Sequence, residues 1–132
     1  MKYSRFMLSL CFSLFGASFL WAHHSLTAEY DQKKPVTLEG TLTKLDWRNP
    51  HAWIFLDVKN ASGGVDKWQC ELGSPNAMTH AGFTPDSVKE GEDIILDGLL
   101  AKKAANICST RVVKSKDGRV LLSQSEGDRG QK

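Results

Sequence analysis

Short segments that alternate apolar and polar residues constrain the fold of this 132-residue chain more than its other features do. The clearest segment is VTLEGTLTKLDW, residues 36–47, whose apolar residues recur near every second position. A period of two predicts a β-strand, and Gly40 within it predicts the bulge or bend that a curled barrel strand needs. The same reasoning predicts further strands at residues 52–58, 65–72, 93–101, 109–114 and 119–123.

Turn and cap residues separate these segments. Asn49 and Pro50 favour a turn before His51, and residues 60–64 (NASGG) form a hairpin loop. Ser74 followed by Pro75 is typical of a helix N-cap with proline at the first helical position, which predicts a short helix over residues 75–81.

Five or six strands with one short helix between the third and the fourth predict a mainly β fold, a small barrel like an OB-fold. A small lipocalin-like or immunoglobulin-like domain is the alternative, although both usually need more strands. We expect one barrel domain over residues 23–124, and the charged, glycine-containing residues 125–132 predict a disordered tail.

The first residues are typical of an export signal. A short basic stretch with Lys2 and Arg5 precedes residues 6–20, which carry no charge. This apolar run is shorter than the roughly 20 residues that a membrane-spanning helix needs, and Ala22 supplies a small residue for cleavage. We therefore expect a signal peptide over residues 1–22, a periplasmic or secreted protein and no membrane span after cleavage. A cut after Ser18 is the alternative.

Cleavage changes the charge balance. The whole chain has 17 basic and 15 acidic residues, and removal of Lys2 and Arg5 leaves 15 of each. A neutral chain lacks the positive charge that binding to phosphate backbones requires, so we expect no nucleic-acid partner.

Cleavage also removes Cys11 and leaves Cys70 and Cys108 as the remaining cysteines. An even pair in an oxidising compartment favours a disulfide, while two buried free thiols are the alternative. The third and fifth strands are neighbours in an OB barrel, which favours the Cys70–Cys108 disulfide.

The histidines suggest a metal site. Cleavage after Ala22 would leave the α-amino nitrogen of His23 beside its own imidazole, and one further imidazole would complete a histidine brace, which favours Cu(II). His51, in a turn at a strand end, is the better third ligand, and His80 on the short helix is the weaker one. His24 offers a competing copper mode through the terminal amine, the intervening amide and its imidazole.

Three tryptophans suggest a ligand-binding face. Trp47, Trp53 and Trp68 fall on the first three predicted strands, where OB-folds bind ligands, and Glu71 precedes a turn that could border a pocket at the barrel mouth. The alternative is that these aromatic side chains fill and surround the barrel. No nucleophile motif or carboxylate pair accompanies them, which favours a binding or accessory protein over an enzyme.

Several strings together resemble a family of small exported bacterial proteins known only as a domain of unknown function. The most specific are His-His-Ser after the signal, residues 49–51 (NPH) and residues 71–76 (ELGSPN), and the likeness runs from about residue 23 to about residue 122. The resemblance implies an exported OB-type barrel with no established activity, and it places His23, His24 and His51 in family motifs. Cys70 and Cys108 are not part of the pattern.

These observations predict a small exported binding or accessory protein that binds copper through His23, His24 and His51. One alternative is a copper-dependent redox enzyme of the histidine-brace type. The other is an envelope module that binds a protein, a small ligand or a glycan without metal.

Overall fold

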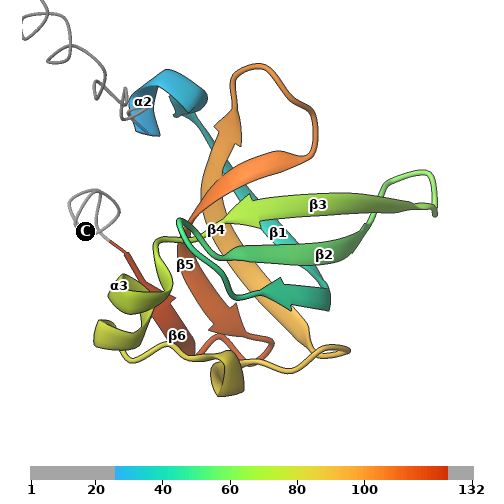
Figure 1. Ribbon diagram of the computed structural model, residues 1–132. Coiled ribbons are helices and arrows are strands. Elements are labelled where there is room, and N and C mark those ends of the chain that lie inside the picture. Colours follow the sequence, from blue (N-terminus) through green and yellow to red (C-terminus); the bar gives the residue numbers. More distant parts are fainter. Residues whose placement is uncertain (1–25, 125–132) are drawn as a thin grey trace, which may run out of the picture.

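The computed structural model describes residues 26–124 and contains six strands in that range (Figure 1). The elements are α2 (Leu26–Glu29), β1 (Tyr30–Asp46), β2 (Trp53–Lys59), β3 (Val65–Glu71), α3 (Pro75–His80), η1 (Pro85–Ser87), β4 (Asp93–Ala101), β5 (Ile107–Ser115) and β6 (Val120–Ser123). This order, with α3 between β3 and β4, confirms the predicted mainly β fold. The predicted signal peptide and tail lie outside the described residues.

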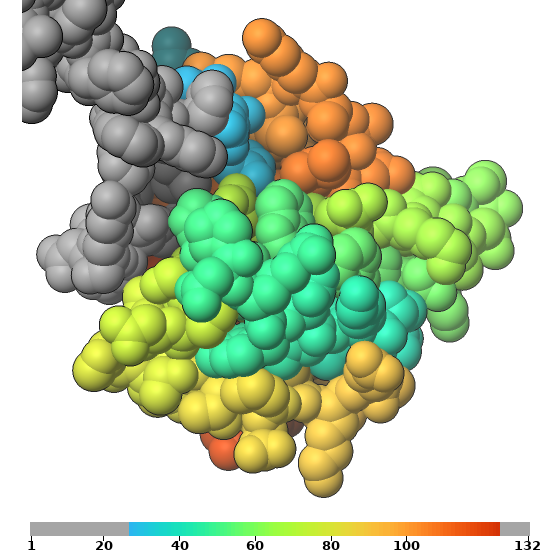
Figure 2. All heavy atoms as spheres, viewed as in Figure 1, coloured from blue at the N-terminus to red at the C-terminus, as the bar shows by residue number. Residues whose placement is uncertain are grey.

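The strands form one sheet in the order β3-β2-β1-β4-β5-β6. An additional parallel pairing joins β3 to β5, and it closes strands β1 to β5 into a ring. Neighbouring strands are otherwise antiparallel, as expected for an OB-type barrel. The hairpin of β2 and β3 projects from the body of the molecule (Figures 1 and 2).

The long strand β1 belongs to both sides of the barrel. Its first part pairs with β4 as far as Thr41, and its last part pairs with β2 from Thr41 onward. Gly40 precedes this change of partner, and an added Cβ there would lie 2.7 Å from the carbonyl oxygen of Asp57. The close approach of β2 explains why glycine occupies this position. The bulge of β1 against β2 falls between Leu42 and Lys44, two residues after the predicted position.

Two strands begin earlier than the pattern predicts. β1 starts at Tyr30 rather than at Val36, and β5 starts at Ile107 rather than at Ser109. The register of β1 against β4 shifts between Tyr30 and Pro35. The residues between these two positions are mostly charged and lie at this bulge. They do not alternate as the rest of β1 does, and for this reason the sequence pattern did not include them in the strand.

The barrel interior holds the apolar residues of the alternating strands. Ile54 and Leu56 of β2 are at most 1% exposed, and their neighbours on the chain are more exposed, as the alternation of a β-strand requires. Met78 of α3 and Phe83 after it are fully buried and join the same cluster. The helix segment therefore covers one end of the barrel (Figure 1).

The start of α3 is as predicted. The amide of Ala77 donates to Ser74 Oγ over 3.2 Å, and Pro75 occupies the first turn. The helix ends at His80, one residue before the expected end.

No helix among residues 26–124 is long and apolar enough to cross a membrane.

Substitution of Gly40 tests the close approach of β1 and β2 at this residue. In Gly40→Ala the new methyl group meets backbone atoms of β2, and we expect the free energy of unfolding to fall by about 1 to 3 kcal/mol, the usual cost of overpacking. Urea denaturation measures this change. The control is Gly64→Ala in the β2–β3 loop, where the nearest atoms belong to the side chain of Asn60. Equal stability of both variants would contradict the close approach at Gly40.

Candidate functional site

His51 lies in the loop between β1 and β2, and backbone hydrogen bonds attach this loop to the end of β3. The amide of Ala52 donates to the carbonyl of Gly73 over 3.0 Å, and the amide of Leu72 donates to the carbonyl of Ala52 over 2.8 Å. The Asn49–Pro50 peptide that precedes His51 is cis. These bonds place His51 beside Glu71, the last residue of β3.

Glu71 connects two residues that are far apart in the sequence. One carboxylate oxygen accepts a hydrogen bond from the hydroxyl of Tyr30, at the start of β1, and the other contacts Nδ1 of His51. Glu71 is 8% exposed and Tyr30 is 3% exposed. A buried carboxylate is costly unless it is hydrogen-bonded, so the two partners together allow Glu71 to be buried here. We call Tyr30, Glu71 and His51 the Tyr–Glu–His cluster.

The cluster orients the imidazole of His51. Because an ionised carboxylate only accepts hydrogen bonds, the proton of the contact lies on Nδ1. Within residues 26–124 the imidazole is hydrogen-bonded through Nδ1. Nε2 is therefore available to a partner from outside this range. The side chain is 40% exposed, so such a partner can reach it.

Glu71 also determines the protonation of His51. Its hydrogen bond raises the pKa of His51 above the ordinary value of 6.5; partial burial opposes this, while the negative charges of Glu71 and Glu29 add to it. Protonated His51 therefore stabilises the fold fully below about pH 6.5, and this contribution is lost as the pH rises through the raised pKa.

The predicted disulfide is present. Cys70 and Cys108 are bonded where β3 and β5 pair, and both residues are fully buried. The next pair along the two strands is Glu71 and Ser109. The cross-link therefore lies directly beside the Tyr–Glu–His cluster.

The three tryptophans do not share one face. Trp47 and Trp68 pack against the core, and the Trp47 ring lies 6.3 Å from that of Phe83. Trp53 pairs with Glu71 across β2 and β3, on the side opposite to the buried Ile54. Two of the four residues predicted to form the ligand face, Trp53 and Glu71, are thus neighbours. The other two, Trp47 and Trp68, pack against the core.

The remaining metal candidates are separate from His51. His23 and His24 lie outside the described residues, and His80 is exposed at the end of α3. Residues 26–124 contain no group of three or more His, Cys, Asp or Glu side chains that could hold a metal ion. Any metal at His51 therefore needs ligands from beyond this part of the chain.

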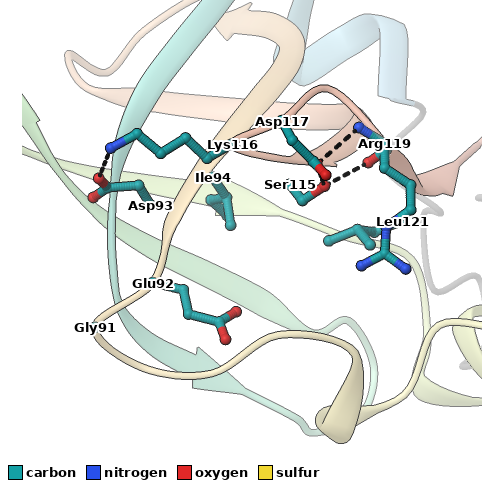
Figure 3. Close-up of a pocket in the computed structure, with 9 residues that line it drawn as sticks. All are labelled: Gly91, Glu92, Asp93, Ile94, Ser115, Lys116, Asp117, Arg119 and Leu121. Atoms are coloured by element: carbon teal, nitrogen blue, oxygen red, sulfur yellow. Dashed lines mark hydrogen bonds and ion pairs between the residues drawn. The ribbon is translucent and has the colours of Figure 1, made fainter.

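A depression of about 440 Å³ lies between the start of β4 and the β5–β6 hairpin (Figure 3). Several polar groups on its wall are bonded to one another: Lys116 pairs with Asp93 over 2.8 Å, and Asp117 accepts hydrogen bonds from the hydroxyl of Ser115 and the backbone amide of Arg119. The predicted site residues are not part of its lining. We therefore place the candidate site at the Tyr–Glu–His cluster rather than in this depression.

Tyr30 is the site residue that the sequence did not reveal. It stands in the string AEYD, before the first recognisable alternation, and the bulge that follows hides its strand. The acid that contacts it is 41 residues away along the chain. The available signal was an aromatic residue a few positions before the predicted strand. Such a residue carries no information about which side chain it contacts.

The chain belongs to the Family of unknown function (DUF6152), whose model matches residues 13–108. This range includes all three residues of the cluster. No curated protein matches the chain.

Two solved structures are similar to it. One is the mitochondrial single-stranded DNA binding protein Rim1 of S. cerevisiae, with 6% identity, a TM-score of 0.48 and coverage of 69% of this chain and 96% of that chain. The other is the N-terminal domain of PriB from Thermoanaerobacter tencongensis, with 16% identity, a TM-score of 0.44 and coverage of 64% and 97%. The barrel assignment rests on the strand pairing, and nothing about function follows from these likenesses.

Neutralisation of Glu71 tests the electrostatics of the cluster. In Glu71→Gln we expect the pKa of His51 to fall, because the amide carries no charge to favour the imidazolium. NMR titration of the imidazole from about pH 5 to about pH 9 follows it. The control is Asp57→Asn, which removes a carboxylate of β2 that pairs with Lys67. An unchanged pKa in Glu71→Gln would show that the contact does not form in solution.

Proposed function

We propose that the protein is an exported, non-enzymatic accessory protein that binds Cu(II) through its freed amino terminus and His51. The ligands would be the α-amine and imidazole of His23 together with Nε2 of His51. Tetragonal nitrogen ligation suits Cu(II), which also heads the affinity order of the divalent ions. Signal cleavage after Ala22 is the step that creates the terminal amine.

The hydrogen bond between His51 and Glu71 carries this proposal. Histidines that bind metals commonly donate their other ring N–H to a carboxylate, which orients the ring and makes the ligating nitrogen more basic. Nδ1 of His51 has this partner, and Glu71 is in turn held by Tyr30. The cluster thus has the form of one metal ligand with its supporting groups.

The amino-terminal arm begins close to His51. Glu29, the last residue of α2, directly precedes Tyr30, which donates to Glu71, and Glu71 contacts His51. Residues 26–29 form α2, so the three residues from His23 to Leu26 are the part of the arm that can extend, and they span about 10 Å. The length of this arm supports a site that the terminus and His51 share.

His24 offers a different mode, in which the terminal amine, the intervening amide and the His24 imidazole bind the ion without His51. The oriented ring of His51 supports the brace over this mode. The two modes differ in one measurable respect, because loss of His51 weakens the brace and leaves the His24 mode intact.

A copper titration with authentic and altered termini tests the function. We expect protein that begins at His23 to bind Cu(II) at least about ten times more tightly than protein whose terminal amine is acetylated, or than His51→Ala. His80→Ala is the matched control and should bind like the parent, since His80 is exposed on α3. Calorimetry gives the affinity, and electron spin resonance reports the nitrogen ligands. Affinity should also fall in acid as His51 takes up a proton.

Equal and weak binding by all of these proteins would refute the brace. It would favour the metal-independent alternative, in which the surface near Trp53 binds an envelope partner or a glycan. Tight binding accompanied by reductant-dependent peroxide formation, lost in His51→Ala, would instead favour the copper-dependent redox enzyme.

A further inference from the structure

The candidate site is divided between two sides of the barrel. His51 and Glu71 belong to the side formed by β2 and β3. Ala52, the neighbour of His51, is hydrogen-bonded to Leu72 over 2.8 Å and to Gly73 over 3.0 Å. This side therefore carries the oriented imidazole and its carboxylate as one unit.

Tyr30 and the chain before it belong to the side formed by β1 and β4. Tyr30 pairs with Ala101 of β4. The amide of Lys102 donates to the carbonyl of Glu29 over 2.9 Å, and Lys102 Nζ donates to the carbonyl of Thr27 over 2.6 Å. This second side therefore holds α2, the first described element, and the two sides meet where β3 pairs with β5.

The β3–β5 pairing is the shortest in the ring of five strands. It consists of three residue pairs, Gln69 with Ile107, Cys70 with Cys108 and Glu71 with Ser109, whereas β1 and β4 share eight and β2 and β3 share seven. The disulfide is the middle pair of the three. A covalent bond thus lies at the point where the ring has the fewest backbone contacts.

We propose that the Cys70–Cys108 disulfide makes the metal site conditional on oxidation, because it holds the side that carries His51 against the side that carries α2, the element that follows the proposed amino-terminal ligands in the sequence. This inference rests on the proposed copper function. The oxidised protein has a complete ligand set. Thiol–disulfide exchange with an external dithiol breaks the S–S bond, leaves Cys70 and Cys108 as thiols and converts the dithiol into a disulfide. In the reduced protein the amino terminus keeps its own two nitrogen ligands, and His51 leaves the set.

The hydrogen bond from Tyr30 to Glu71 crosses the same boundary, and so does the 3.0 Å bond from the Gln69 amide to the Asn106 carbonyl. Such bonds exchange with bonds to water when the strands separate, so each opposes opening only weakly. The disulfide joins residues 38 positions apart and prevents separation as long as it is intact. Its removal therefore lets the two sides part locally while β1 still connects them.

A variant without the disulfide tests this proposal. In Cys70→Ala/Cys108→Ala, produced with His23 as its first residue, we expect Cu(II) affinity to fall about tenfold or more, to the level of His51→Ala. Amide hydrogen exchange should accelerate at residues 69–71 and 107–109 in the metal-free protein. Addition of His51→Ala to this double variant should then cause no further loss of affinity.

The matched control is Val113→Ala, a fully buried position of β5 outside the β3–β5 pairing. This variant loses stability and keeps the disulfide, so its copper affinity should equal that of the parent. Circular dichroism confirms that each variant is folded. If the double variant is unfolded in buffer alone, all proteins are compared in sucrose, which favours the folded state.

Parental copper affinity in the folded double variant, or unchanged exchange at the two segments, would overturn the proposal. The exchange measurement needs no metal, so it separates this inference from the proposed function. Accelerated exchange with no copper binding in the oxidised parent would refute the copper site and, with it, a role of the disulfide in metal binding. Accelerated exchange with affinity lost in parallel supports both.

Discussion

β3 pairs with β5 in parallel through three residue pairs, and the rest of the structure depends on this contact. Without it the six strands would form an open sheet, with β3 at one edge and β6 at the other. With it, β1 to β5 enclose a common interior in which Ile54, Leu96 and Val113 are almost completely buried. An open edge would also expose unpaired backbone groups to other chains. Closure therefore serves packing and backbone hydrogen bonding at once.

Closure also explains why a carboxylate is tolerated at the end of β3. Glu71 is surrounded by the loop before β2, the start of β1 and the neighbouring β5. A charged group at such a place needs hydrogen bonds to its oxygens, and Tyr30 and His51 supply one to each oxygen from separate elements. The same arrangement that satisfies Glu71 orients the imidazole, so burial and ligand orientation have one physical cause.

Much of this fold could be predicted because its signals are local. Alternation indicated the strands, as in β2, and Ser74 and Pro75 marked the start of α3. Gly40 lies where β1 and β2 approach closely, near the bulge between Leu42 and Lys44. The Cys70–Cys108 disulfide followed from the expected neighbours of an OB barrel and is present.

The site was harder to predict from the sequence, because its contacts join distant parts of the chain. Tyr30 lies beyond a bulge that interrupts the pattern, and its partner Glu71 was marked only by the turn that follows it. The separate positions of Trp53, Trp68 and Trp47 depend on strand parity and on where β1 ends, which composition does not show.

The position of Cys108 has a consequence for the order in which the molecule is built. A ribosome delivers Cys70 well before Cys108, and α3 and β4 lie between them. The correct thiol partner is thus absent until the fifth strand has been made, so the disulfide cannot close the ring before then. Parallel contacts between distant segments form slowly in general. Tyr30, although made early, belongs to a cluster whose neighbouring strand β5 pairs with β3 only after most of the chain has been made.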